Sequence, residues 1–310
     1  STLPKVATRR GVYVGDVKIR KEISKRLRML GLNETKTYTL TSPEMAKRFQ
    51  YESTEPVVLP NPMSIDKSVV RTSILPSLIN VYEYNKARNI KDILLYEISK
   101  TYDKAYNEEI KVAMLIKGDY ITNEWNHEVI KCDFYTLKGI IENLLDYLGF
   151  KNRYSFEKTT TKDMHPGMCA KIILDREDVG IIGRIHPNYK KDEIYLAELS
   201  VTKLYNKQIK PIKFKEATKY PEIIKDVAFV IPNEMEAITI KKQIMSSGGR
   251  LLSGIEIFDL YPNILENKKS IAYKLTFSDP SRTLTDEEVM NVFNKIINEV
   301  TTKCNVKIRD

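Results

Sequence analysis

The sequence predicts an α+β protein with two domains, a mixed or mostly antiparallel sheet domain over residues 1–205 and a βαββαβ domain over residues 206–310. The chain has 310 residues, which is long enough for more than one domain. In the first part, many short apolar runs are separated by turn residues and few runs have helical spacing, which favours hairpins. A lysine-rich segment without clear periodicity, KLYNKQIKPIKFKEATKYPE, marks the boundary between the domains.

The first domain is expected to begin with a helix over residues 16–31, whose apolar residues recur at helical spacing before a glycine. Ser42 and Pro43 occupy the cap and first-turn positions of a short helix. A loop that begins at Asn61 leads into a third helix, and residues 133–149 form a fourth with one apolar stripe. The predicted strands cover residues 34–41, 55–60, 92–102, 109–119, two runs around a charged turn within 170–188, and 194–201.

The order of strands and helices is clearer in the second domain than in the first. Strands are predicted over residues 223–231, 251–261 and 268–277, with a last short strand over 306–310. One helix follows the first strand and ends in two glycines. The other helix begins at Thr285, which forms a capping box with Glu288. The order βαββαβ is the ferredoxin-like arrangement.

Alternation along these strands predicts which face of the second sheet is open. Val227, Phe229 and Ile231 point to one side, as do the apolar residues of the third strand, so this side should pack against the helices. The other side then displays small and polar residues: Ala228, Val230, Ser270, Ala272, Lys274 and Thr276. An open face of this kind can receive unstacked RNA bases, although a plain solvated face would have the same pattern.

Charge and cysteine content narrow the class of protein. The net charge is +9, with 35 basic and 27 acidic residues in the first 210 and 15 and 14 in the rest. The interdomain lysines, interleaved with aromatic residues, could follow a phosphate backbone or form a solvated linker. Three separated cysteines indicate reduced thiols and a cytoplasmic protein.

No apolar run could span a membrane, and the beginning of the sequence indicates a fragment of a longer protein.

Residues that could support catalysis are scarce. The sequence has no glycine-rich phosphate loop and no nucleophile elbow, and its three histidines lack metal-ligand spacing. A synthetase-like active site needs arginines that bind ATP phosphates and a glycine-lined nucleotide pocket, and the sequence offers only scattered candidate residues for such a site: Arg71, Glu97 and Arg184. Arg71, in NPMSIDKSVVRTSILPSLI, lies where a substrate-binding arginine could lie, but it lacks supporting partners. We therefore expect no catalytic or metal-binding residues, and a structural or subunit-contacting role for Arg71.

Motifs along nearly the whole chain resemble the C-terminal half of bacterial phenylalanyl-tRNA synthetase β subunits. In chain order they are NPMSIDKSVVRTSILPSLI, LLYEISKTY, FYTLKGIIENLL, HPGMCAKIIL, GIIGRIHPN, KYPEIIKDVAFVI, FDLY and KKSIAYKLTFSDPSRTLTDEEV. The resemblance implies a class II synthetase-like fold without its active-site residues, followed by a ferredoxin-fold anticodon-binding domain. It also implies an α2β2 enzyme with tRNA(Phe) as substrate, in which the α subunit uses ATP and Mg²⁺ while this fragment holds no cofactor.

The resemblance also implies a set of RNA contacts. Ala228, Tyr261 and Ser270 match the family's anticodon-contacting positions, with the tyrosine stacking on a base. Because the second domain is near neutral, phosphate attraction is left to nearby lysines: Lys213, Lys215, Lys219, Lys268 and Lys269. Two alternatives stay open, a domain that still activates an amino acid, and a subunit-interaction scaffold that does not bind RNA.

Overall fold

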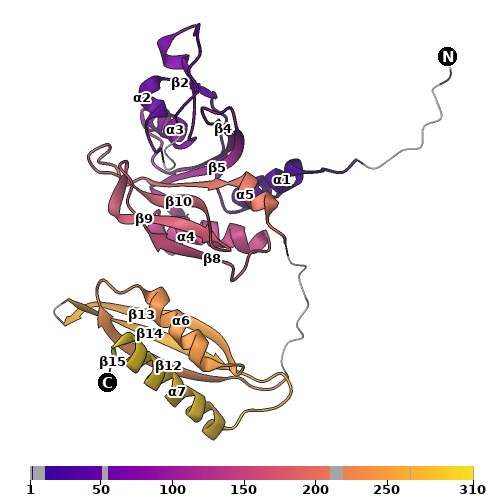
Figure 1. Ribbon diagram of the computed structural model, residues 1–310. Helices are drawn as coiled ribbons and strands as arrows, with labels where there is room; N and C mark the ends of the chain where they lie inside the picture. Colours follow the sequence, from indigo (N-terminus) through magenta and orange to yellow (C-terminus); the bar gives the residue numbers. More distant parts are fainter. Residues whose placement is uncertain (1, 3–10, 51–54, 210–218, 266, 310) are drawn as a thin grey trace. The chain divides into compact units, whose positions relative to one another are not determined.

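A computed structural model describes residues 2, 11–50, 55–209, 219–265 and 267–309. Its contacts divide the chain into two compact units, residues 1–212 and 213–310 (Figure 1). The predicted boundary at residues 205 and 206 falls at the end of the last helix of the first unit, Val201–Asn206 (α5). Each unit is described separately below.

The first unit is built on a seven-stranded sheet with the order β1-β4-β5-β11-β10-β9-β8. All neighbouring strands are antiparallel except β1 and β4, which are parallel, so the predicted mixed sheet is confirmed. The strands are Asn33–Glu34 (β1), Ile93–Tyr102 (β4), Glu108–Lys117 (β5), Tyr154–Lys158 (β8), Met164–Leu174 (β9), Glu177–Ile185 (β10) and Tyr195–Ser200 (β11). Two small sheets accompany it, Leu40–Thr41 (β2) with Val69–Val70 (β3), and Asp119–Asn123 (β6) with Glu128–Lys131 (β7).

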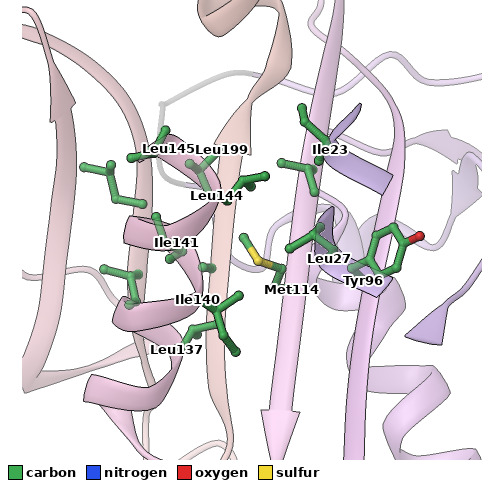
Figure 2. Packing of buried hydrophobic residues seen from close by; sticks show 14 of the residues in the cluster. Ile23, Leu27, Tyr96, Met114, Leu137, Ile140, Ile141, Leu144, Leu145 and Leu199 are labelled. Carbon is green, nitrogen blue, oxygen red and sulfur yellow. The ribbon is translucent and has the colours of Figure 1, made fainter. Parts of the chain in front are cut away.

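Helices cover both faces of this sheet. Asp16–Met29 (α1), Phe134–Tyr147 (α4) and α5 bury their apolar residues against one face, where Met114 and Tyr96 also lie (Figure 2). Leu75–Lys86 (α3) packs against the other face, beside Leu115. Successive residues of β5 therefore enter different cores, which explains its unbroken apolar run. Both faces of the sheet are thus used for packing.

Local sequence signals explain where the first unit's helices begin. The side chain of Ser42 accepts a hydrogen bond from the backbone of Met45 at the start of Pro43–Ala46 (α2). Asp133 does the same for the amide of Thr136 in α4, at 2.6 Å. These bonds satisfy amides that have no partner inside the helix. The short 3₁₀ helix Ile65–Lys67 lies in the loop before α3.

The second unit has the predicted βαββαβ order and ferredoxin-like strand arrangement. Its sheet has the order β13-β14-β12-β15, all antiparallel, so the first and third strands of the unit are central. Its elements are Ile223–Pro232 (β12), Ala237–Gly248 (α6), Leu252–Leu265 (β13), Lys268–Phe277 (β14), Asp286–Cys304 (α7) and Lys307–Ile308 (β15). The capping box of Thr285 and Glu288 is present. Both helices pack on one face, over Phe229 and Tyr273.

Several elements of the first unit differ from the prediction. Residues 34–41 form two short strands with coil between them, and residues 55–60 contribute only the bridge from Val58 to Val69. The prediction of one continuous strand in each place was therefore wrong. The β6–β7 hairpin, β8 and α5 were not predicted, because these elements are short and lack strong periodicity.

Candidate nucleic-acid interface

Arg71 is buried in the first unit and paired with Glu97. The Nη2 atom lies 2.9 Å from a carboxylate oxygen of Glu97, and the two side chains are 1% and 0% exposed. Nη1 donates to the hydroxyl of Thr37 at 2.7 Å, and the same hydroxyl donates to the second carboxylate oxygen of Glu97 at 2.7 Å. Nη1 also reaches Ser77, and Nε reaches the carbonyl of Lys100, each at 3.4 Å. These hydrogen-bond partners all belong to the fold itself, and the structural or subunit-contacting role expected for Arg71 stays a prediction.

The position of Arg71 joins three separate segments. Its backbone amide donates to Thr39 and its carbonyl accepts from Tyr102. Glu97 lies on β4, so the guanidinium connects the loop before α3 to the large sheet. Because the guanidinium of Arg71 is covered and hydrogen-bonded within the protein, it is not available to bind a phosphate or a substrate carboxylate. Arg184, the third scattered candidate, pairs with Glu193 at 3.1 Å.

Two further buried carboxylates also serve the fold. Glu198 on β11 accepts hydrogen bonds from the hydroxyl of Ser73 and the amide of Ile74, at 3.0 and 2.7 Å, just before α3 begins. Asp163 accepts from the amide of Phe49 at 2.9 Å and from Arg48 at 3.1 Å. Both carboxylates therefore hold backbone amides of neighbouring segments in place.

Nothing in the described part of the chain brings together three or more His, Cys, Asp or Glu side chains that could hold a metal ion. Two of the histidines instead stabilise local turns, since the Nδ1 atoms of His165 and His186 accept the backbone amides of Gly167 and Asn188. Among the helices that the structure describes, none combines the length and apolarity of a membrane span.

One face of the second unit's sheet carries no helix among the described residues. Strand register places Ala228 opposite Ala272, and Ser270 opposite both Val230 and Tyr261. These residues alternate with the buried Phe229, Ile271 and Tyr273, so they lie on the opposite side of the sheet, as alternation predicted. The floor of this open face, Ala228, Ser270 and Ala272, is made of small side chains.

The floor is more covered than alternation indicated. Ser270 is 0% exposed and Ala272 is also buried, so the expectation that both are displayed to solvent was wrong. The hydroxyl of Ser270 is buried without a hydrogen-bond partner among the described residues. An unpaired buried hydroxyl is costly, which makes this position unusual in a folded domain.

Tyr261 lies on the edge strand of the open face and is 45% exposed. Its hydroxyl is hydrogen-bonded to the carboxylate of Asp259, and this bond is the main cause that raises the pKa of Tyr261. The guanidinium carbon of Arg309 lies 4.4 Å from the centre of the tyrosine ring. Arg309 was not predicted from the sequence, since it follows the short strand β15, on the other edge of the sheet.

A second aromatic residue of the open face was also missed. The ladder between β13 and β14 shifts register between Ile257 and Asp259, which makes Phe258 the extra residue of a bulge. Phe258 is half exposed and lies 5.6 Å from the ammonium group of Lys274, a residue of the open face. The signal for it was present, because consecutive apolar residues at 257 and 258 interrupt the period of two.

The predicted phosphate-binding lysines are placed only in part. Lys219 and Lys268 are exposed, and Lys269 donates to the backbone carbonyl of Asn233 at 2.8 Å. Lys213 and Lys215 lie outside the described residues. The predicted RNA contacts of the lysines, and of Ala228, Tyr261 and Ser270, remain predictions.

Comparisons with known proteins agree with the fold. Residues 1–201 match the model of the phenylalanyl tRNA synthetase beta chain CLM domain, and residues 218–309 match the ferredoxin-fold anticodon binding domain. A phenylalanine–tRNA ligase beta subunit of Listeria monocytogenes is 36% identical over 99% of the chain, and that of Geobacillus kaustophilus is 34% identical over 96%. The aligned regions cover 40% and 38% of those two proteins.

A solved pyrrolysyl tRNA synthetase of Desulfitobacterium hafniense is 12% identical, with a TM-score of 0.46, and the alignment covers 60% of this chain and 64% of that one. The family models account for nearly the whole chain and confirm the resemblance predicted from its motifs. The chain therefore belongs to the family of phenylalanyl-tRNA synthetase beta chains.

Proposed function

We propose that this chain is a non-catalytic part of a phenylalanine–tRNA ligase, in which the first unit docks on the α subunit and the second binds the anticodon region of tRNA(Phe). The observation that carries the RNA-binding part is the open sheet face of the second unit, with Tyr261 and a cation beside a floor of small residues. Base stacking on an exposed aromatic ring and phosphate attraction to cations are the two main sources of affinity for single-stranded RNA.

The first unit supports the non-catalytic part of the proposal. The buried Arg71, Glu97, Glu198 and Asp163 all have protein partners, and α3 covers one face of the large sheet. Under this proposal the α subunit of an α2β2 enzyme in the cytoplasm binds ATP and Mg²⁺ and charges the tRNA. The buried polar groups of this chain maintain a synthetase-like fold for assembly.

The two alternative functions make different predictions. A unit that still activates an amino acid would catalyse phenylalanine-dependent exchange between ATP and pyrophosphate without the α subunit. A pure subunit-interaction scaffold would bind the α subunit and not the anticodon arm. Mixing the chain with the cognate α subunit and tRNA, and measuring which complexes form by size, separates these alternatives.

The direct test of the RNA-binding proposal compares two single substitutions in an anticodon-arm binding assay. Tyr261→Ala removes the ring on the open face, which is expected to cost about 1–3 kcal/mol of binding free energy. Lys295→Ala removes an exposed cation from α7, which packs on the opposite face. The proposal predicts a clearly larger loss for Tyr261→Ala, and equal losses would contradict it.

A further inference from the structure

Tyr261 and Arg309 reach each other across the open face. Their backbones belong to opposite edges of the four-stranded sheet, because Tyr261 lies on β13 and the amide of Arg309 bonds to Ala228 beyond the last strand, β15. Strands are about 4.8 Å apart, so the two edges are separated by about 14 Å. A 4.4 Å approach of guanidinium and ring therefore requires both side chains to extend over the two central strands.

This arrangement explains the burial of the floor. Ser270 is the direct neighbour of Tyr261 in the ladder, and Ala272 is paired with Ala228, whose carbonyl accepts the amide of Arg309. Both helices that the structure describes in this unit pack on the other face, which leaves the side chains that cross the open face to cover its floor. The small floor residues leave room for the ring and the guanidinium to lie across them.

Two properties of the open face, where the side chains of Tyr261 and Arg309 meet, favour a ligand. The hydroxyl of Ser270, the ladder neighbour of Tyr261, is buried without a hydrogen-bond partner among the described residues, which is a cost that a ligand's polar edge could remove. In addition, Arg309 is exposed and pairs with no carboxylate among the residues that the structure describes. A stacked guanidinium without a paired anion keeps its donors for a phosphate.

We propose that Arg309 is an RNA-contacting residue of the open face, which leaves the ring of Tyr261 when a single-stranded base stacks there and then pairs with a phosphate of the bound strand. The proposal rests on the proposed function, and it adds a residue that exchanges one partner for another. In the free protein the guanidinium shields the ring and the floor. In the complex the base takes its place, and the Ser270 hydroxyl becomes accessible to the edge of that base.

The salt dependence of binding distinguishes a phosphate contact from a structural support. Each phosphate contact on a single strand contributes a slope of about 0.7 to the dependence of log K on log salt. Loss of one contact therefore weakens binding about fivefold at 0.1 M salt and has little effect near 1 M. Loss of a stacking contact weakens binding by a factor that changes little with salt.

The experiment measures the affinity of the whole chain for the anticodon arm of tRNA(Phe) between 0.1 and 1 M salt. Arg309→Ala is expected to weaken binding about fivefold at 0.1 M, to lower the slope by about 0.7, and to do the same in the Tyr261→Ala background. Arg309→Lys is expected to restore the slope because it retains the charge. Lys295→Ala serves as the charge-matched control on the helix side and should leave the slope nearly unchanged.

Two results would overturn the proposal for Arg309 alone. One is an Arg309→Ala effect equal to that of Lys295→Ala. The other is an effect that is independent of salt and disappears in the Tyr261→Ala background, which would show that Arg309 only supports the ring. Failure of the unsubstituted chain to bind the anticodon arm would contradict the proposed function, and therefore this proposal as well. Thermal unfolding of each variant establishes that it is folded.

Discussion

Replacing Arg71 with alanine would leave the carboxylate of Glu97 in the core without its cation. Arg71 is 1% exposed and Glu97 is 0% exposed, so water cannot replace the lost guanidinium. Removal of one member of a buried ion pair typically costs about 3–5 kcal/mol, because the remaining charge has no partner. For a unit of this size, a loss of about 4 kcal/mol lowers the unfolding temperature by roughly 10 °C.

Thermal unfolding monitored by circular dichroism, with the transition of the first unit followed separately, measures this loss. Lys104→Ala is the matched control, since it breaks the exposed ion pair of Lys104 with Glu55 and should change the unfolding temperature much less. The double variant Arg71→Met with Glu97→Gln should be more stable than Arg71→Ala, because no unpaired charge remains. An unchanged unfolding temperature for Arg71→Ala, combined with slower adenylation in the reconstituted enzyme, would refute the structural role.

Three other predictions concern single groups. Arg282 holds the pKa of Glu288 down to about 2, so this carboxylate stabilises the fold at pH values above its ordinary pKa and loses that effect as the pH falls toward 2. NMR titration of Arg282→Ala should show a higher pKa for Glu288. An unchanged pKa would contradict this cause. Burial raises the pKa of the Cys132 thiol to about 12 and that of Cys169 to about 11, so iodoacetamide at pH 8 should label neither in the folded chain, as mass spectrometry can check. Ser270→Ala removes a buried hydroxyl that has no hydrogen-bond partner among the described residues, so the unfolding temperature should not fall. The affinity for the anticodon arm should decrease. A lower unfolding temperature would show that the hydroxyl has a partner in the free protein.

Local patterns predicted the second unit well because each of its elements carries its own signal. Alternation identified the core side of β12 and β14, and the capping box identified the start of α7. The same reasoning overextended the strands at residues 34–41 and 55–60 of the first unit. Apolar and β-branched residues there indicated strands, but most of them find no neighbouring strand to pair with.

The candidate site was predictable only where it follows from one strand. Alternation assigned Ser270 to the open face, but it gives no information about side chains that cross that face from another strand. Arg309 reaches Tyr261 only after the sheet has formed, and Glu97 pairs with Arg71 across 26 residues of sequence. Such partners depend on tertiary structure. Phe258, by contrast, could have been found from the interrupted alternation.

The central claim is that the second unit recognises an anticodon arm rather than RNA in general. The most direct measurement compares the affinity of the whole chain for the anticodon arm of tRNA(Phe) with its affinity for an acceptor-arm hairpin of the same length and charge. We expect tighter binding to the anticodon arm, with most of that preference lost in Tyr261→Ala, because unstacked loop bases are what an open sheet face binds. Equal affinity for the two RNAs, or a preference that survives Tyr261→Ala unchanged, would contradict the account.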